Sequence, residues 1–296
     1  MGFTMGQSGI EAELGTKRAR GKRGFRVRCA ALAVLGLVSM GDTCVIQDTP
    51  TKYPIVLAHG FAGWGEAEGD DYFYGVKQNL ELLGYTVFEP TVSPVNAIDV
   101  RAGELASAIL DQFPRGKVNV IAHSMGGLDA RYMISHLGMD AHVASLVMLS
   151  TPNHGCAVSD VAVGALPGAT QEIIDFILSF WGLSWDGVVQ TTTQYVEETL
   201  NPTTPDMPGV SYYSYGGNGL FLLNPKLWLS YPIVLQYQGV NDGMVGVSSA
   251  QWGTYLDTLN ADHFDEVNQP PPPNPTEFDA LDFYTNLARF LQKNGF

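Results

Sequence analysis

Residues 117–127 have the sequence Lys-Val-Asn-Val-Ile-Ala-His-Ser-Met-Gly-Gly. The first seven form a mostly apolar run typical of a strand that is buried on both faces, and Ser124 to about His136 has a helical pattern. A serine at such a strand-to-helix junction occupies a strained turn that exposes its hydroxyl, and the turn needs very small residues two positions away on either side. Ala122 stands there in place of the commoner glycine, and Gly126 follows. The pattern predicts a nucleophile at Ser124.

Strand and helix patterns alternate on either side of this junction. Apolar runs predict strands at 53–58, 85–88, 117–123 and 143–150, and helices are predicted at 75–83, 97–113 and 124–136. Further strands are expected near 210–215 and 232–238, and a closing helix at 276–293. Alternating strands and helices indicate a parallel sheet covered on both faces. We therefore expect an α/β-hydrolase fold with a mostly parallel central sheet.

The alternation breaks between about residues 155 and 200. Residues 171–185 form a strongly apolar helical stretch between the core elements. One interpretation is ordinary packing of a helix on the sheet. The other is a mobile lid, whose apolar inner face covers the site and opens at lipid. We expect a helical lid insertion here.

The composition is that of a globular protein with an acidic body. Hydrophobic residues make up 45% of the 296 and charged residues 16%, which leaves ample material for a core. Residues 1–43 contain seven basic and three acidic side chains, a net charge of +4. The net charge of the whole chain is −14, so residues 44–296 carry −18. Such a body repels phosphate backbones, and nucleic acid is not expected as a partner.

The first 43 residues resemble a targeting segment. A basic cluster is followed by an uncharged apolar run from Cys29 to Met40, which is too short for a membrane span of roughly 20 residues. We expect a secretory signal at 1–43, cleaved near 40–44, and one catalytic domain at 44–296. A short uncleaved anchor is the alternative. Once exported, Cys44 and Cys156 could pair, but their spacing does not decide this.

A serine hydroxyl is a poor nucleophile until a base takes its proton and a carboxylate orients that base. In α/β-hydrolases these residues follow the order serine, acid, histidine. Of the six histidines, only His263 lies after a plausible acid. Asp242 is the predicted acid because it lies in a turn directly after the strand predicted at 232–238. Three competitors lie too near His263 in sequence to occupy a separate strand end: Asp257, Asp262 and Asp265.

Hydrolysis also needs backbone N–H groups that stabilise the developing oxyanion. The residue after the nucleophile, Met125, is expected to supply one. Phe61, in the His59-Gly-Phe loop after the first strand, is expected to supply the other. A simple tight turn is the alternative interpretation of that loop.

Five stretches give the chain a resemblance to bacterial triacylglycerol lipases of the pseudomonad and Proteus type, over roughly residues 51–293. They are Lys52-Tyr-Pro-Ile-Val-Leu-Ala-His-Gly-Phe61, Asp71-Tyr-Phe-Tyr-Gly75, Val118-Asn-Val-Ile-Ala-His-Ser-Met-Gly-Gly127, Asn241-Asp-Gly-Met-Val-Gly246 and Asp262-His-Phe-Asp-Glu-Val-Asn-Gln269. The resemblance implies the same triad of Ser124, Asp242 and His263. It also implies that Arg101 steadies the oxyanion loop, although Arg101 could instead be a charge on a solvated helix face.

The resemblance further implies a structural calcium ion near the base, held by oxygen ligands. Asp265 and the carbonyl of Gln269 match the ligands of the family. Asn224 stands where the family has an aspartate, so one negative charge is missing, and the carbonyl of Pro273 lies in an altered proline run. The alternative is that Asp265 only forms a hydrogen bond that fixes the loop.

We therefore expect a secreted lipase that hydrolyses acylglycerols at an oil–water interface through an acyl-enzyme, without an organic cofactor. It is expected to be a monomer, and a folding chaperone or secretion machinery is left open as a partner. A soluble carboxylesterase or polyester depolymerase of the same fold is the main alternative. A non-catalytic lipid-binding relative is the remote one.

Overall fold

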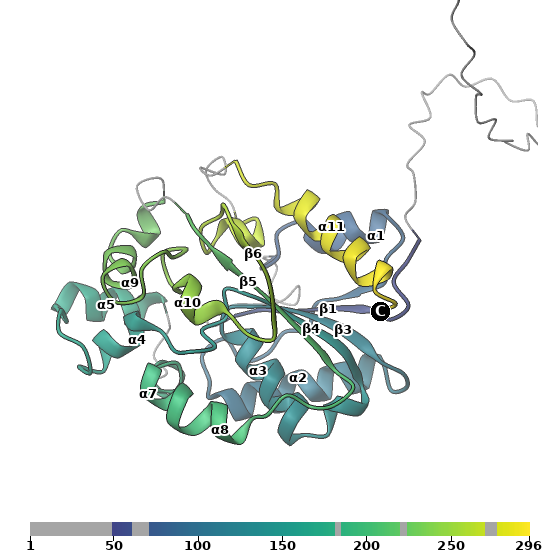
Figure 1. The fold of residues 1–296 in the computed structure, drawn as a ribbon, viewed down its shortest axis with the longest axis horizontal. Coiled ribbons are helices and arrows are strands. Elements are labelled where there is room, and N and C mark those ends of the chain that lie inside the picture. Colours follow the sequence, from purple (N-terminus) through teal and green to yellow (C-terminus); the bar gives the residue numbers. More distant parts are fainter. Residues whose placement is uncertain (1–48, 61–70, 181–184, 220–223, 270–276) are drawn as a thin grey trace, which may run out of the picture. The chain divides into compact units, whose positions relative to one another are not determined.

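The computed structural model of the chain describes residues 49–60, 71–180, 185–219, 224–269 and 277–296. Six strands form a parallel sheet in the order β2-β1-β3-β4-β5-β6 (Figure 1). Their bounds are β1 Ile55–Ala58, β2 Val87–Phe88, β3 Val118–His123, β4 Val143–Leu149, β5 Ser211–Gly217 and β6 Thr254–Leu259. Strands β1, β3 and β4 are buried along their whole length. This agrees with the continuous apolar runs in their sequence.

Helices cover both faces of the sheet, as expected for a parallel sheet. Helices α1 and α11 lie on one face, and α2 and α3 lie on the other (Figure 1). The α-helices are α1 Val76–Leu82, α2 Ile98–Gln112, α3 Met125–His136, α4 Ala157–Ala162, α5 Gln171–Phe180, α6 Trp185–Gln190, α7 Thr193–Tyr195, α8 Asn201–Thr203, α9 Ser230–Gln238, α10 Val247–Ala250 and α11 Ala280–Lys293. Shorter helical turns are η2 Met139–Ala141, η3 Val196–Leu200, η5 Pro225–Leu227 and η6 Asp265–Val267.

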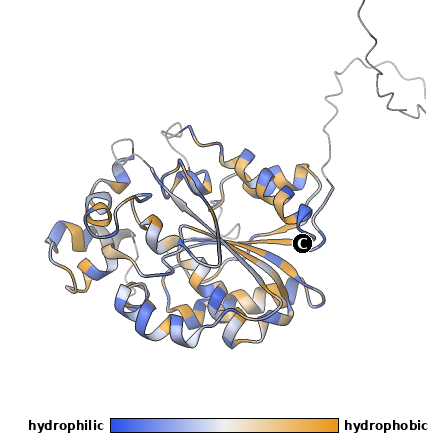
Figure 2. Cartoon of the chain, in the orientation of Figure 1, coloured by the Kyte–Doolittle hydropathy of each residue, from blue (hydrophilic) through white to orange (hydrophobic). Residues whose placement is uncertain are grey.

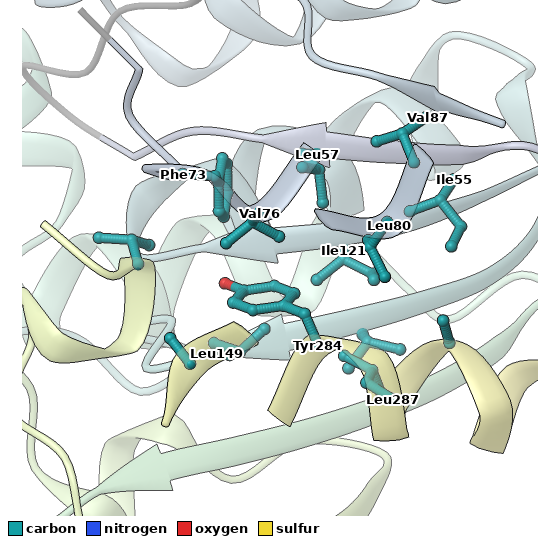
Figure 3. Packing of buried hydrophobic residues seen from close by; sticks show 14 of the residues in the cluster. Ile55, Leu57, Phe73, Val76, Leu80, Val87, Ile121, Leu149, Tyr284 and Leu287 are labelled. Carbon is teal, nitrogen blue, oxygen red and sulfur yellow. The ribbon is translucent and has the colours of Figure 1, made fainter. Parts of the chain in front are cut away.

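Helix α11 shows how the sequence directs this packing. Asp279 caps its first turn by accepting a hydrogen bond from the N–H of Asp282 (2.9 Å). Tyr284, Leu287 and Leu291 recur at helical spacing and are buried against α1 and the sheet (Figure 3). Burying each such apolar side chain stabilises the fold by about 1.5–3 kcal/mol. Figure 2 shows the same amphipathic pattern along α11, whereas the central strands are mostly hydrophobic.

The two ends of the described chain meet beside the sheet. The backbone N–H of Lys52 donates to the carbonyl of Phe296 (2.6 Å). Lys52 precedes β1 by three residues, so this contact lies at the edge of the sheet where β1 begins.

Most of the predicted elements are confirmed, but in the C-terminal third one predicted strand is wrong and one strand was not predicted. Residues 232–238 belong to helix α9 and not to a strand. Pro232 lies in its first turn, where proline is tolerated, and Gly239 ends it with a positive φ of 78°. The last strand, β6, was not predicted, because this edge strand is only partly buried and its sequence contains no continuous apolar run.

The segment between β4 and β5 consists of short helices, α4 to α8. The single helical stretch predicted at 171–185 corresponds to α5 and to the start of α6, separated by residues 181–184, which lie outside the described part. Buried residues on α4, α6 and η3 pack into a common cluster with α9, and they anchor the segment to the body of the protein.

The proposed signal segment and Cys44 lie outside the described residues. Cys156 is a free and fully buried thiol that lies 3.2 Å from the carbonyl oxygen of Met244. Among the described helices, none is both long enough and apolar enough to cross a membrane.

Candidate active site

The junction between β3 and α3 has the strained geometry expected of a nucleophile elbow. Ser124 has φ 55° and ψ −133°, outside the helix that starts at Met125. A positive φ is uncommon for a residue with a side chain, and it persists only where the surroundings enforce it. The Ser124 N–H donates to the carbonyl of Leu149 at the end of β4 (2.9 Å), so the neighbouring strand holds the turn.

Two glycines leave the space that this turn requires. A Cβ atom on Gly126 would lie 2.6 Å from the carbonyl oxygens of both Ala58 and His59. A Cβ atom on Gly60 would lie 2.7 Å from the Cβ of Ser124. The loop after β1 therefore packs directly on the serine, and any larger residue would push the two apart.

The predicted acid and base are hydrogen-bonded. Nδ1 of His263 lies 2.6 Å from Oδ2 of Asp242, and both side chains are buried. The other carboxylate oxygen of Asp242 accepts from the N–H groups of Met244 (2.8 Å) and Val245 (2.7 Å). Because the carboxylate accepts at Nδ1, the proton of a neutral His263 is on Nδ1 and Nε2 is free to act as a base.

Asp242 reaches this position by a route that differs from the predicted one. It follows helix α9 and the turn at Gly239, and not a strand. An isolated bridge between Asn241 and Gly246 closes the turn that contains it. The end of β5 lies close behind, since a Cβ on Gly217 would lie 2.7 Å from the Cβ of Asp242.

The two predicted oxyanion donors are only partly described. Met125 is the first residue of α3 and is fully buried. The first N–H groups of a helix have no partner within the helix, so the Met125 N–H can bind an anion. Phe61 lies outside the described residues, which end at Gly60 on this side.

Arg101 is a fully buried cation with several partners, so it is not a solvated helix charge. Its guanidinium donates to Asp129 (2.8 Å), to the carbonyl of His59 (3.0 Å) and to that of Gly60 (3.1 Å), and also to the carbonyl of Ser93. Burial raises the pKa of Asp129 to about 7, although Arg101 opposes the shift. Arg101 thus holds the backbone of the loop that leads to Phe61.

His59 supports the same loop from within. Nδ1 of His59 lies 2.9 Å from the Gly60 carbonyl, and its Nε2 accepts from the N–H of Val92 (3.1 Å). Burial and the nearby Arg101 lower the pKa of His59 to about 3. The ring is therefore neutral, with its proton on Nδ1.

A further polar cluster lies behind the acid and base, and no role for it was predicted from the sequence. Tyr72 Oη lies 2.8 Å from Nδ1 of His123, and Nε2 of His123 lies 3.3 Å from Oε2 of Glu266. Glu266 also accepts from Ser150 Oγ (2.7 Å). The rings of His123 and His263 pack with centroids 4.4 Å apart. Tyr72 and Glu266 lie within stretches that carry the family resemblance, and this was the available signal.

The predicted calcium ligands lie near the base, but they are not all described. Asn224 Nδ2 donates to Oδ2 of Asp262 (3.0 Å), and its Oδ1 accepts from the N–H of Lys226 (3.1 Å). The N–H of Asp262 lies 3.4 Å from Oδ2 of Asp265. Asp262 therefore links Asn224 to Asp265, and the amide of Asn224 presents its nitrogen and not its oxygen to this carboxylate. Carboxylate and amide oxygens can bind a hard cation, and Asn224 would have to turn its amide for its oxygen to take part.

The other two calcium candidates were predicted to act through their backbone carbonyls. Gln269 is held in the same loop, because its Nε2 donates to the carbonyls of Asp71 (2.8 Å) and Tyr72 (2.6 Å). Pro273 lies outside the described residues.

A parallel sheet with a strained serine elbow and a histidine–carboxylate pair defines a serine hydrolase of the α/β-hydrolase class. Residues 98–215 match the family model described as the alpha/beta hydrolase fold. A triacylglycerol lipase of Vibrio cholerae is 30% identical over 256 residues, which cover 74% of this chain and 81% of the relative. A triacylglycerol lipase of Pseudomonas fragi is 28% identical over 290 residues, which cover 83% of this chain and 98% of the relative.

A solved Bacillus licheniformis lipase in its mature form has the same fold. It superimposes with a TM-score of 0.67 at 23% identity, covering 83% of this chain and 95% of that one. The chain belongs to the triacylglycerol lipase family, and it is a carboxylic ester hydrolase.

Proposed function

We propose that the protein is a secreted triacylglycerol lipase that uses Ser124, His263 and Asp242 as its catalytic triad. The observation that carries this assignment is the buried 2.6 Å contact between His263 and Asp242, together with the strained backbone at Ser124. The packed rings of His123 and His263 support it, because they bring the residue before the serine against the base.

The reaction follows from the chemistry of these groups. Ser124 Oγ attacks the ester carbonyl carbon while Nε2 of His263 takes its proton, and a tetrahedral oxyanion forms. The same proton passes to the leaving alkoxide, and an acyl-enzyme and a free alcohol result. Water, deprotonated by His263, then attacks the acyl-enzyme and releases the fatty acid. Asp242 orients the imidazole and stabilises its charged form.

The N–H groups of Met125 and Phe61 are proposed to bind the oxyanion. Arg101 is the proposed support of that loop, because its guanidinium donates to the carbonyls of His59 and Gly60. A buried guanidinium with four partners has little freedom to move. It can therefore keep the loop backbone in place as charge develops on the substrate.

Ser124→Ala tests the triad directly. We expect turnover of dissolved p-nitrophenyl butyrate to fall by at least about 1000-fold, while the melting temperature stays near that of the wild type. Ser145→Ala on β4 is a control at a serine outside the site. Hydrolysis by Ser124→Ala at the wild-type rate would remove the proposed mechanism.

Long-chain acylglycerols at an oil–water interface are the proposed substrates, with the segment at 155–200 as the lid. Helix α6 carries two exposed apolar residues, Trp185 and Val189, which support a surface that contacts lipid. Activity on emulsified trioleate should rise sharply once an interface forms, relative to dissolved tributyrin. Equal or lower activity on trioleate would favour the soluble esterase.

Export is proposed from the first 43 residues, in which a basic cluster precedes a short apolar run. Expression of the whole chain in a secreting bacterial host, followed by N-terminal sequencing of protein from the medium, tests this proposal. We expect the mature chain to begin near residues 41–44. Retention of residues 1–40 on a membrane-bound protein would indicate an uncleaved anchor.

Calcium is proposed as a structural ion near the base, with Asp265, Asn224 and the carbonyls of Gln269 and Pro273 as ligands. When bound, it would fix the loop that carries His263. Because Asn224 lacks the charge of an aspartate, Asn224→Asp should raise the melting temperature in millimolar Ca²⁺ more than in a chelator. Identical melting with Ca²⁺ and with the chelator, for both proteins, would argue against the site.

A further inference from the structure

The hydroxyl of Tyr72 lies between the loop after β1 and the residue before the nucleophile. It contacts Nδ1 of His123 at 2.8 Å, and it lies beside the backbone of Gly60. A Cβ atom on Gly60 would lie only 2.8 Å from this hydroxyl. One phenol group thus joins two segments that are more than 60 residues apart in sequence.

The direction of the contact with His123 follows from the proton that each group holds. Burial and the nearby His263 lower the pKa of His123, so its ring is neutral and one ring nitrogen can accept. Burial raises the pKa of Tyr72, so its hydroxyl keeps its proton and can donate it to Nδ1 of His123.

The far side of the His123 ring is held by Glu266. A neutral His123 that accepts at Nδ1 has its proton on Nε2, which faces Oε2 of Glu266 at 3.3 Å. Both side chains are fully buried, and Ser150 Oγ donates to the other carboxylate oxygen of Glu266. His123 is therefore hydrogen-bonded at Nδ1 and faces the buried carboxyl group of Glu266 at Nε2, while its ring packs on His263.

The segment that contains Tyr72 is itself attached to the loop of the base. Gln269 donates to the carbonyl of Tyr72 (2.6 Å), and Asn268 donates to that of Tyr74 (2.7 Å). The N–H of Tyr74 donates to the carbonyl of Val267 (3.1 Å). Movement of Tyr72 is thus restricted from the side of His263 as well.

We propose that Tyr72 is a positioning residue that fixes the oxyanion loop at Gly60 to the nucleophile through His123, with Glu266 as the support of His123. This inference rests on the proposed triad and goes beyond it. Arg101 and His59 contact the carbonyl of Gly60, and the Tyr72 hydroxyl lies against the Cα of the same residue. The backbone of Gly60 is therefore held from two sides.

Tyr72→Phe removes one hydroxyl and keeps the ring. The contact with Nδ1 of His123 is then lost, and the loop at Gly60 can shift relative to Ser124. A misplacement of about 1 Å costs on the order of 100-fold in rate. We expect kcat for p-nitrophenyl butyrate to fall about 10–100-fold, with KM within about threefold of the wild type. Tyr74→Phe, at an exposed tyrosine two residues away, is the matched control and should leave both constants unchanged.

Two substitutions of His123 separate its contacts. The oxygen of Asn can replace Nδ1 and accept from Tyr72, whereas Gln reaches the position of Nε2 and contacts Glu266. We expect His123→Asn to retain at least about fivefold more kcat than His123→Gln at similar melting temperatures. Tyr72→Phe combined with His123→Gln should be no slower than the slower single variant, because both remove the same contact.

The outcomes distinguish this inference from the proposed triad. A wild-type kcat for Tyr72→Phe would overturn the positioning role, and so would a change confined to KM, which would make Tyr72 a substrate contact. His123→Gln at least as active as His123→Asn would overturn it too. If Ser124→Ala retained full turnover, the triad itself would fail, and this measurement is independent of Tyr72.

Discussion

The junction of β3 with α3 and the insertion between β4 and β5 differ sharply in how they are packed. Every residue from 121 to 130 is buried, whereas none of residues 163–175 is. At the junction, backbone carbonyls lie so close to Gly126 that a methyl group would not fit. In the insertion, Gly164 has no neighbouring atom within 4 Å of an added Cβ. The first region is densely packed, and the second is loosely packed.

This difference fits the two tasks proposed for these regions, which are bond cleavage and the movement of a lid. Bond cleavage requires reacting groups held to within a fraction of an ångström, and dense packing provides this. A lid has to change position, so few of its contacts can be strong. The insertion is anchored at α4, α6 and η3, and the exposed stretch lies between these anchors. The following predictions test the contrast.

The largest effect is expected for Asp242→Asn. The N–H groups of Met244 and Val245 would bind the amide oxygen, so the NH₂ group would face His263. Nδ1 would then have to accept, and Nε2 would carry the proton and lose its function as a base. We expect kcat to fall about 10³–10⁴-fold. Asp257→Asn, at an exposed carboxylate on β6, is the control. Comparable losses in both variants would refute the assignment of the acid.

A methyl group should be tolerated in the insertion but not at the elbow. Gly126→Ala places a Cβ 2.6 Å from two carbonyl oxygens, and we expect it to destabilise the fold by about 3 kcal/mol or more. Gly164→Ala meets no atom and should cost about 1 kcal/mol, because its φ is 77°. Urea unfolding measures both. A loss for Gly164→Ala as large as that for Gly126→Ala would contradict the contrast.

The pH dependence of stability should reveal the buried, neutral His59. Its pKa is about 3 in the folded state against 6.5 for an unperturbed histidine, so only the unfolded chain takes up this proton between these values. Its contribution to stability therefore falls by about 1.4 kcal/mol per pH unit as the pH drops below 6.5. We expect His59→Gln to have a lower free energy of unfolding than the wild type at pH 7.5. The difference between the two proteins should shrink by about 1.4 kcal/mol per pH unit below pH 6.5. If the two free energies changed with pH in parallel, His59 would have the same pKa in the folded and unfolded chain.

The smallest effect is expected at the exposed surface of the insertion. Trp185→Ser should change the unfolding free energy by less than about 0.5 kcal/mol and should leave tributyrin hydrolysis within twofold. If the insertion meets lipid, activity on emulsified trioleate should fall severalfold. Leu137, at the end of α3, is equally exposed (44%), and Leu137→Ser should not affect either substrate. Unchanged trioleate activity for Trp185→Ser would remove this residue from the lipid-binding surface.

The elements that could be predicted from the sequence are those that are buried on both faces. Strands β1, β3 and β4 are buried on both faces, so burial alone determines their residues. Helix α9 was mistaken for a strand because its apolar, partly β-branched sequence fits either structure, and packing decides between them. Strand β6 pairs along one edge only, so its side chains are under little constraint.

In the candidate site, too, some residues could be predicted from the sequence and others could not. Ser124, Asp242 and His263 could be named because strand ends and chain order limit the choice, and His263 and Asp242 are in contact. Tyr72, His123 and Glu266 could not be assigned a role, because a buried polar residue is recognisable only by its partners. These partners lie 51 and 143 residues away from His123. Sequence spacing carries no information on such contacts.

The hydrogen bond between Lys52 and Phe296 has a practical consequence for attaching this enzyme to other materials. Both ends of the described chain lie where β1 begins, whereas Ser124 follows the opposite end of the parallel strand β3. A tag, carrier domain or solid support linked through residue 296 would therefore face away from the reacting serine. Such a linkage would leave the catalytic side of the molecule turned toward an oil droplet.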